Sequence, residues 1–425
     1  TDSEITDFDT YSKEPLYGEQ WGHGQLKLNF LWKQPKITDK RPVIALIDTG
    51  VDITHPDLAD NIWTNEEERN GTEEEDDDAN GFKDDLHGWD FVNKTGRLGD
   101  WNGHGTHCAG IAAAVGDNKI GITGANPDAF IMPITVMQSD GTGDVATIIK
   151  GIDYAAANGA DVISMSIGGY GYSLAEEQAL AKAYSTAVLV AAAGNDNKCI
   201  YAHDCPVNKK NAYQNGPMFP AAFTFVLGVE ASTKDGGLAS FSNFDEDGPV
   251  FSTYSEDKLY NYELRAPGAQ IMSTFPGGKY KVLNGTSMAC PNLAGLALLL
   301  RQYVTENFPS IAGDNVKVAA MVNKLMMSTA DIALNTNGLP YAVRKQGAGL
   351  ANLTDCLTTK AYITTFDKNG KPMDKPKLEL GDDPAKTGVY EMTFDIVNFG
   401  SKAVKYDLGA YVMTEGVSDT KTSAG

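Results

Sequence analysis

Short apolar runs alternate with helical stretches from Val43 to about Leu353, and this alternation constrains the fold more than any other feature of the chain. The apolar runs cover 43–47, 130–136, 162–166, 188–192 and 223–229, and the helical stretches cover about 145–157, 174–186, 291–305 and 315–328. Strands that alternate with helices pair in parallel and are covered on both faces, and nearly continuous apolar strands fit that burial. The sequence therefore predicts an α/β fold with a mostly parallel central sheet and helices on both faces.

The segments on either side of this central domain, which we place at 41–355, differ from it in character. Residues 1–40 are mostly polar, and we expect this extension to pack on the central domain through Trp21, Leu26, Phe30, Leu31 and Trp32. In the region 356–425, apolar and polar residues alternate, which is typical of half-buried strands. The alternating positions are Tyr390, Met392, Phe394 and Ile396, then Val404, Tyr406 and Leu408. We predict a partial, fibronectin-like β-sandwich there, with too few strands for a complete one.

The formal net charge of −21 argues against two classes of partner. Nucleic acid requires a basic face, and an anionic membrane surface also attracts lysine and arginine. No apolar stretch approaches the length needed to span a bilayer. The chain begins with polar residues and no methionine, which indicates a processed or engineered start rather than a signal peptide.

The five cysteines give two different indications. Cys108 and Cys290 lie in apolar segments of small residues and are typical of buried free thiols. Cys199 and Cys205 lie six positions apart in a polar loop, so a small disulfide and two free thiols stay equally open.

Ser287 lies between a glycine turn and an apolar helical stretch, in Asn284-Gly285-Thr286-Ser287. A helix N-terminus offers unpaired N–H groups and a positive partial charge. Both favour the negative charge that develops when a hydroxyl attacks a carbonyl. A serine here is therefore a candidate nucleophile, provided that a base lies within reach.

Two further strings supply a base and an acid. Asp48 ends the buried run that begins at Val43, and His104 stands between two glycines at the start of a small-residue helix. An acid that orients a histidine, which in turn activates a serine, forms one catalytic unit. Asp52 lies close in sequence, but the strand-end position favours Asp48. His107 is interpreted as a structural histidine, because a zinc protease motif needs two histidines at i,i+4 with a glutamate.

These three strings resemble the Asp, His and Ser boxes of the subtilases, the subtilisin-like serine proteases, and occur in the same order. The resemblance runs from about Glu14 to Leu353. It implies that Asn195, after the apolar run 188–192, donates a hydrogen bond to the oxyanion. It also implies two substrate-binding edges, which are Ser166, Ile167, Gly168 and Gly169 on one side and Gly141, Thr142 and Gly143 on the other. Glycines there let an extended polypeptide add as a strand.

An acidic loop before the His box predicts a calcium site. Oxygen-bearing residues alternate along it as Asp76, Asp78, Asn80, the Phe82 carbonyl and Asp84, with glycine at position 81. This is the ligand spacing of a calcium loop, although the closing glutamate of an EF-hand is missing. The alternative is a solvated acidic loop, because 73–78 is an unbroken run of acids.

The family resemblance implies a second structural calcium. Its ligands would be Asp57, Asn118 and the carbonyls of Ile120 and Ile122, with Glu14 as a weaker candidate. One extra residue before Asn118 leaves the geometry of this site open.

The sequence therefore predicts a secreted or cell-surface, bacterial-type serine endopeptidase that acts on extended polypeptides. The resemblance also implies a propeptide partner during maturation, and the partial β region suggests a longer cell-envelope protease. Two alternatives stay open, namely a degenerate adhesion module and a processing protease with a single client.

Overall fold

The computed structural model of the chain describes residues 13–28, 40–197, 217–244, 261–335, 337–367, 369–378, 387–407 and 409. Its seven-stranded sheet has the order β2-β3-β1-β4-β5-β6-β7, and every pairing in it is parallel. The strands are β1 (Val43–Asp48), β2 (Trp89–Asp90), β3 (Phe130–Thr135), β4 (Val162–Met165), β5 (Val188–Ala192), β6 (Leu227–Ser232) and β7 (Leu264–Pro267). The predicted parallel sheet is thus confirmed.

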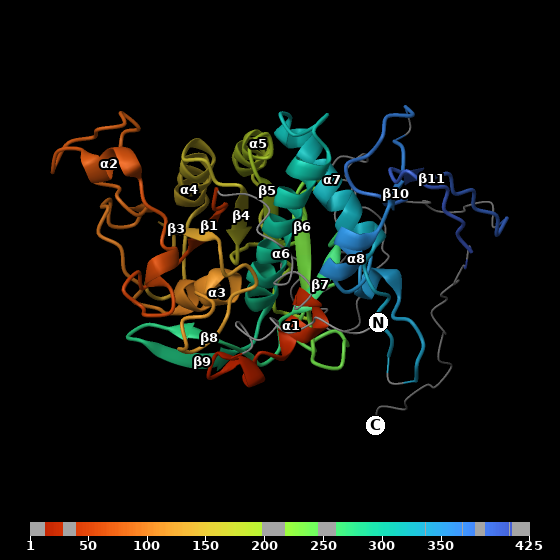
Figure 1. Cartoon of the computed structure of the whole chain (residues 1–425), viewed down its shortest axis with the longest axis horizontal. Coiled ribbons are helices and arrows are strands. Elements are labelled where there is room, and N and C mark those ends of the chain that lie inside the picture. The colour runs from red at the N-terminus through yellow and green to blue at the C-terminus, as the bar shows by residue number, and fades with distance from the viewer. Residues whose placement is uncertain are drawn as a thin grey trace, which may run out of the picture.

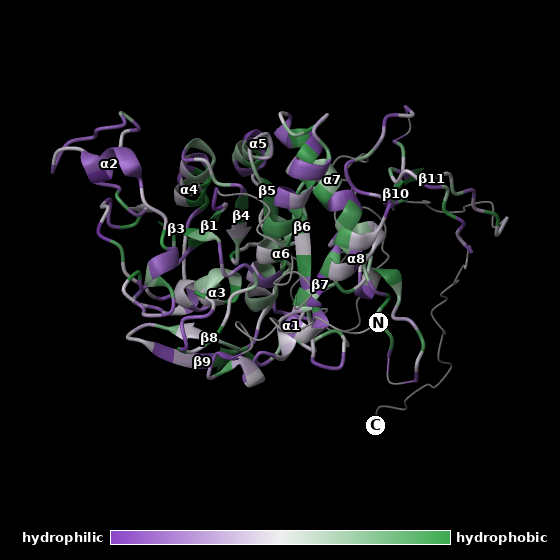
Figure 2. Ribbon diagram, in the orientation of Figure 1, coloured by the Kyte–Doolittle hydropathy of each residue, from purple (hydrophilic) through white to green (hydrophobic). Residues whose placement is uncertain are grey.

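Helices cover the sheet as the alternation predicts. The helices are α1 (Trp21–Gln25), α2 (Glu66–Asn70), α3 (His104–Ala113), α4 (Val145–Ala157), α5 (Leu174–Ala183), α6 (Thr286–Asn307), α7 (Asn315–Ser328) and α8 (Leu353–Thr358). Helices α3 and α6 pack together on the side of the sheet that faces the viewer in Figure 1, whereas α4 and α5 pack together behind it. Buried apolar residues concentrate in the central strands and in α6, and the hydropathy colours of the ribbon in Figure 2 mark hydrophobic residues in these elements.

Three predicted boundaries were wrong. The helix expected at 291–305 begins earlier, at Thr286, because Pro291 lies near its N-terminal end, where a missing N–H is tolerated more easily. The helix expected at 174–186 ends at Ala183. The strand expected at 223–229 begins only at Leu227, because Phe223 and Phe225 lie in turns, where their rings stack at 5.8 Å.

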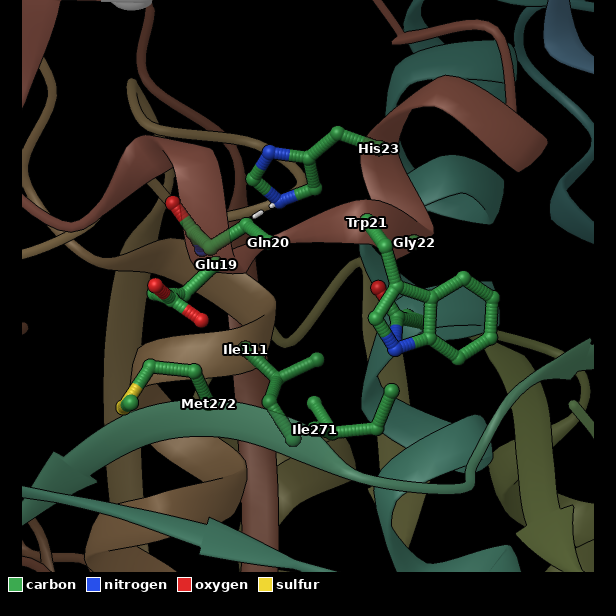
Figure 3. A pocket seen from close by; sticks show the side chains of 9 residues that line it. Glu19, Gln20, Trp21, Gly22, His23, Ile111, Ile271 and Met272 are labelled. Atoms are coloured by element: carbon green, nitrogen blue, oxygen red, sulfur yellow. Dashed lines mark hydrogen bonds between the residues drawn. The ribbon is translucent and has the colours of Figure 1, made fainter. Parts of the chain in front are cut away.

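The N-terminal segment packs on the sheet domain through α1. Leu26 is fully buried, and the Gln20 side chain both donates to Thr123 O at 2.8 Å and accepts from Thr123 N at 2.9 Å. A small pocket stays open where Trp21 faces Ile271, as Figure 3 shows. The other predicted anchors, Phe30, Leu31 and Trp32, lie outside the described residues.

Two antiparallel sheets of two strands each complete the described fold. One pairs β8 (Ile271–Phe275) with β9 (Lys279–Leu283) below α3, and the other pairs β10 (Ala361–Thr364) with β11 (Asp395–Asn398). Only the last part of the strand predicted around 390–396 forms, and Tyr390, Met392 and Val404 are exposed. They stay exposed because the described part of this region supplies one partner strand and no second sheet. Among the described residues of this region, a fibronectin-like sandwich is not seen.

The segment 369–378 is anchored by a buried ion cluster. Lys375 Nζ lies 2.7 Å from Glu263 Oε1 and also donates to Val226 O. Lys377 Nζ approaches the same carboxylate oxygen at 3.2 Å, and Gly228 N donates to Glu263 Oε2 at 2.7 Å. Because Glu263 and Lys375 are almost fully buried, this cluster ties the start of the C-terminal region to β6 and β7.

Candidate active site

Asp48 and His104 form a close pair at the carboxyl edge of the sheet. Asp48 is the last residue of β1, and His104 is the first residue of α3. His104 Nδ1 lies 2.7 Å from Asp48 Oδ1, which also accepts from Thr49 N at 2.7 Å. With Nδ1–H donated to the carboxylate, Nε2 carries the lone pair of the neutral imidazole. The arrangement therefore presents Nε2 as a base.

A buried carboxylate that sequence reasoning missed fixes the loop before His104. Asp100 Oδ1 accepts from Asn102 N, Gly103 N and the Thr49 hydroxyl, and its Oδ2 accepts from the Thr106 hydroxyl and N–H. Gly103 then enters the helix with a φ of +97°, and a Cβ there would lie 2.4 Å from the Phe275 ring. The available signal was an acid four positions before the histidine.

Ser287 is the second residue of α6, so its N–H belongs to the helix N-terminus that has no intrahelical acceptor. Pro291 stands four positions later and lacks the N–H that would normally bond Ser287 O. That carbonyl instead accepts from the Ser166 hydroxyl at 2.9 Å and from Cys108 Sγ at 3.4 Å. The backbone of the candidate nucleophile is therefore held from α3 and from the residue that follows β4, and both of these elements pack on α6.

The hydroxyl of Ser287 is bonded to the backbone that follows β4. Its Oγ donates to Ser166 O at 3.3 Å, and within the described residues it does not hydrogen-bond to His104. Catalytic hydrogen bonds of this kind are often long or poorly aligned until substrate binds.

Asn195 lies beyond the end of β5, opposite the start of α6. Its Oδ1 accepts from Thr286 N at 2.7 Å and from the Thr286 hydroxyl at 3.0 Å. Because these bonds fix the amide oxygen, the Nδ2–H₂ group faces away from Thr286 and is available as a donor. Asn195 is exposed, so this donor reaches the surface where substrate would lie.

The charge of Asp48 favours the protonated form of the His104 imidazole. Burial lowers the pKa of His104, but the attraction of Asp48 outweighs it and raises the pKa well above its ordinary value. Burial lowers the pKa of His107 to about 4, and its Nε2 bonds Lys281 O at 2.9 Å. His107 is therefore a neutral, buried structural histidine. Burial also raises the pKa of Cys108, which keeps it a thiol.

The two predicted substrate segments follow neighbouring strands of the sheet. Ser166 and Ile167 are buried directly after β4, whereas Gly168 and Gly169 are exposed. The backbone of Gly169 pairs with Phe219 through two hydrogen bonds of 2.8 and 2.9 Å. On the other side, 141–143 belong to a turn that Gln138 N closes by donating to Thr142 O at 2.7 Å.

The acidic loop gathers a somewhat different set of oxygens from the predicted one. One carboxylate oxygen each of Glu68, Asp76 and Asp78 lies within 4.8 Å of the other two. The Asp84 carboxylate instead accepts from Glu74 N at 3.0 and 3.1 Å. Asn80 Nδ2 donates to Asp78 at 2.8 Å, and its Oδ1 accepts from Phe82 N. Sequence reasoning missed Glu68, whose signal was only the acidic stretch 66–68.

The second predicted calcium site contains two buried carboxylates. Asp57 accepts from Asn118 Nδ2 at 2.7 Å, from Ile122 N at 2.9 Å and from the Tyr280 hydroxyl at 3.1 Å. Glu14 Oε1 accepts from Asn118 N, whereas its buried Oε2 has no partner in the described structure. Ile120 N donates to Asn118 Oδ1.

Burial raises the pKa of both Asp57 and Glu14, although hydrogen bonds to each carboxylate, and the neighbouring His55 at Asp57, act in the opposite direction. Two buried carboxylates, one with an unused oxygen, fit a hard cation with oxygen ligands.

Cys108, Cys290 and Cys356 are buried free thiols. The predicted disulfide between Cys199 and Cys205 lies outside the described residues. Within the described part of the chain, no helix is both long and apolar enough to cross a membrane.

Comparison with known proteins agrees with this geometry. Residues 39–349 match the model of the Subtilase family. Thermitase of Thermoactinomyces vulgaris is 36% identical over 258 residues, which are 60% of this chain and 74% of thermitase. Subtilisin DY of Bacillus licheniformis is 33% identical over 275 residues, which are 64% of this chain and 80% of that protein. The major intracellular serine protease of Bacillus subtilis is 31% identical over 307 residues, or 72% and 82% of the two chains.

Proposed function

The chain belongs to the Subtilase family and is a subtilisin-like serine endopeptidase, and we propose that Asp48, His104 and Ser287 are its catalytic triad. The observation that carries this assignment is the 2.7 Å pair of His104 with Asp48, at the start of a helix that packs against the helix of Ser287. The degenerate adhesion module is set aside, because the chain is an enzyme of this family.

In the proposed mechanism, His104 Nε2 takes the proton of Ser287 Oγ as this oxygen attacks the scissile carbonyl carbon. Asp48 holds the ring by Nδ1–H and stabilises the imidazolium that forms. The imidazolium then gives its proton to the departing amine, which leaves an acyl-enzyme. Water attacks this ester with His104 again as base, and the second product carries the new carboxylate.

Asn195 Nδ2 and Ser287 N are proposed to hold the oxyanion of each tetrahedral intermediate. The support is geometric, since Thr286 fixes the Asn195 amide oxygen and Ser287 N lies at a helix N-terminus. Donors that are already oriented stabilise developing charge without reorganising.

The substrate is proposed to be an extended polypeptide that adds as a strand along Ser166, Ile167, Gly168 and Gly169, with Gly141, Thr142 and Gly143 on its other side. Both segments lie at the carboxyl edge of the parallel sheet, where ligands of such sheets bind. The exposed backbone of Gly168 supports this role, because no side chain keeps a second backbone away.

Calcium is proposed to stabilise the fold at two places. Asp57, Asn118, Glu14 and the carbonyls of Ile120 and Ile122 form one ligand set, which the unused buried oxygen of Glu14 supports. The acidic loop forms the other, with Glu68 added to the predicted Asp76, Asp78, Asn80, Phe82 and Asp84. Bound calcium supplies positive charge that these acids lack in the described structure.

We also propose a secreted or cell-surface location, maturation with a propeptide, and a fibronectin-like continuation of the region 356–425. The net charge of −21 and the calcium ligand sets suit an extracellular solution. Relatives named as intracellular exist, so family membership leaves the location open. Cell fractionation with an antibody tests it, and recovery only from the cytoplasm would refute secretion.

Labelling with a fluorophosphonate tests the triad directly. We expect an adduct on Ser287, no adduct in Ser287→Ala, and slow labelling in His104→Ala. Labelling of the intact protein at any other serine would overturn the assignment. A random peptide library then separates a broad endopeptidase, which cuts many sequences, from a processing protease that cuts almost none.

A further inference from the structure

Two glycines flank the place where the residue before the scissile bond must lie. In the proposed complex, the substrate runs along 166–169 and its carbonyl oxygen faces Asn195. The side chain of the residue that supplies this carbonyl, called P1, therefore enters between Gly168 and the segment 193–195. Gly194 has a φ of +104°, which suits glycine. We call the place that this side chain takes in the proposed complex, between Gly168 and Gly194, the P1 slot.

Met218 packs against both glycines that flank the P1 slot. A Cβ added at Gly168 would lie 2.8 Å from Met218 Sδ and 2.9 Å from its Cγ, and one added at Gly194 would lie 2.5 Å from its Cε. The thioether thus touches both walls of the slot at once. Met218 is 8% exposed, and its N–H donates to the Tyr262 hydroxyl at 3.1 Å, so its backbone is fixed.

A hydrogen-bond network holds the two walls together. The Tyr170 hydroxyl, just beyond Gly169, donates to Asp196 Oδ2 at 2.5 Å, next to Asn195. Asn243 Nδ2 donates to the same hydroxyl at 2.9 Å, and Asn243 Oδ1 accepts from Asp196 N at 3.1 Å. Because these bonds join segment 166–170 to segment 193–196, the slot cannot widen without breaking them.

We propose that Met218 limits the depth of the P1 slot and makes this enzyme select small, uncharged P1 side chains. The inference rests on the proposed function and goes beyond it by naming the substrate class. An alanine or serine side chain ends above the thioether, whereas a phenylalanine or leucine must displace it from between two backbone walls. A lysine or arginine side chain is longer still and must displace the thioether as well.

The test compares peptides that differ only at P1, with alanine, leucine, phenylalanine or lysine there. We expect kcat/KM of the native enzyme to be at least about 10-fold higher for alanine than for phenylalanine, since pocket contacts discriminate by about 10–200-fold. Met218→Gly and Met218→Ala should raise the phenylalanine-to-alanine ratio by about 10-fold or more. Met218→Leu conserves side-chain volume and should leave the ratio close to native.

Two results would overturn the proposal. One is a native enzyme that already prefers a large aromatic P1 residue, and this result needs no variant. The other is an unchanged ratio in Met218→Gly and Met218→Ala samples that label fully with a fluorophosphonate, which shows that they are folded. Absence of labelling in the native enzyme would instead refute the proposed function, so the two failures are distinguishable.

Discussion

Replacing Lys375 by methionine should destabilise the chain strongly, although this residue lies far along the chain from the proposed triad. The Lys375 side chain is 2% exposed, and its ammonium nitrogen lies 2.7 Å from Glu263 Oε1. Breaking a buried ion pair by removing one partner costs about 3–5 kcal/mol, because the other charge stays buried. The lower end of this energy range applies to Lys375→Met, since Lys377 and Gly228 N still contact Glu263. We therefore expect a loss of about 3 kcal/mol.

Thermal unfolding gives the corresponding shift. An unfolding entropy of about 2.1 cal/mol/K per residue over 425 residues gives about 0.9 kcal/mol/K. A loss of about 3 kcal/mol then lowers Tm by about 3 °C. Calorimetry of Lys375→Met in a Ser287→Ala background measures this shift without self-cleavage. Lys371 is exposed on the same segment, so Lys371→Met is the matched control and should change stability by less than about 0.5 kcal/mol.

Equal melting temperatures for Lys375→Met and Lys371→Met would refute the reasoning, since Lys377 would then satisfy Glu263 alone. The double variant Lys375→Met/Glu263→Gln sharpens the test. Removing both charges should recover part of the loss, and the double-mutant cycle isolates the pair interaction. A double variant that is worse than the sum of the single variants would also contradict the ion-pair account.

Three further predictions concern the proposed site and its calcium. Asn195→Ala should lower kcat about 10²–10³-fold, which is the magnitude known for the corresponding donor of subtilisin, and should still be labelled by the fluorophosphonate. An unchanged kcat would exclude the donor role of Asn195. The value of kcat/KM should rise with pH with a midpoint above 6.5, because Asp48 raises the pKa of His104. The variant Asp48→Asn should lower this midpoint and should also lower kcat roughly 10⁴-fold. A midpoint that does not move in this variant would argue against the pairing of Asp48 with His104. Chelation should remove about 2.7 kcal/mol of the stability that is measured at a calcium concentration of 100 times Kd. In Asp57→Asn or Glu14→Gln, part of this loss should disappear. If both variants lose as much stability on chelation as the native chain does, the acidic loop is left as the one proposed calcium site.

The sequence predicted those features that a local pattern determines. The strand 188–192 and the helices 145–157 and 315–328 have the bounds that their apolar patterns indicate. Asp48 lies at a strand end as expected, because parallel strands bring their carboxyl ends to one edge of the sheet.

Features that depend on contacts with residues far away in the chain could not be predicted from local sequence patterns. The alternation around Tyr390 and Ile396 indicates which side chains share a face, but it does not supply a strand to pair with or a layer to cover them. Glu68 joins Asp76 and Asp78 only because the loop folds back on α2. Met218 carries no signal of its own, since its role depends on two glycines that lie elsewhere in the chain.

The position of the nucleophile illustrates how a local rule and a distant contact combine. Pro291 removes the backbone donor for Ser287 O, which any reader of the sequence could deduce. A buried carbonyl without a donor is costly, so other elements must supply one, and they are the Ser166 hydroxyl and the Cys108 thiol. Cys108 lies one helical turn after His104, and Ser166 begins the proposed substrate strand. One missing N–H therefore makes the placement of Ser287 depend on the same two elements that carry the base and the substrate.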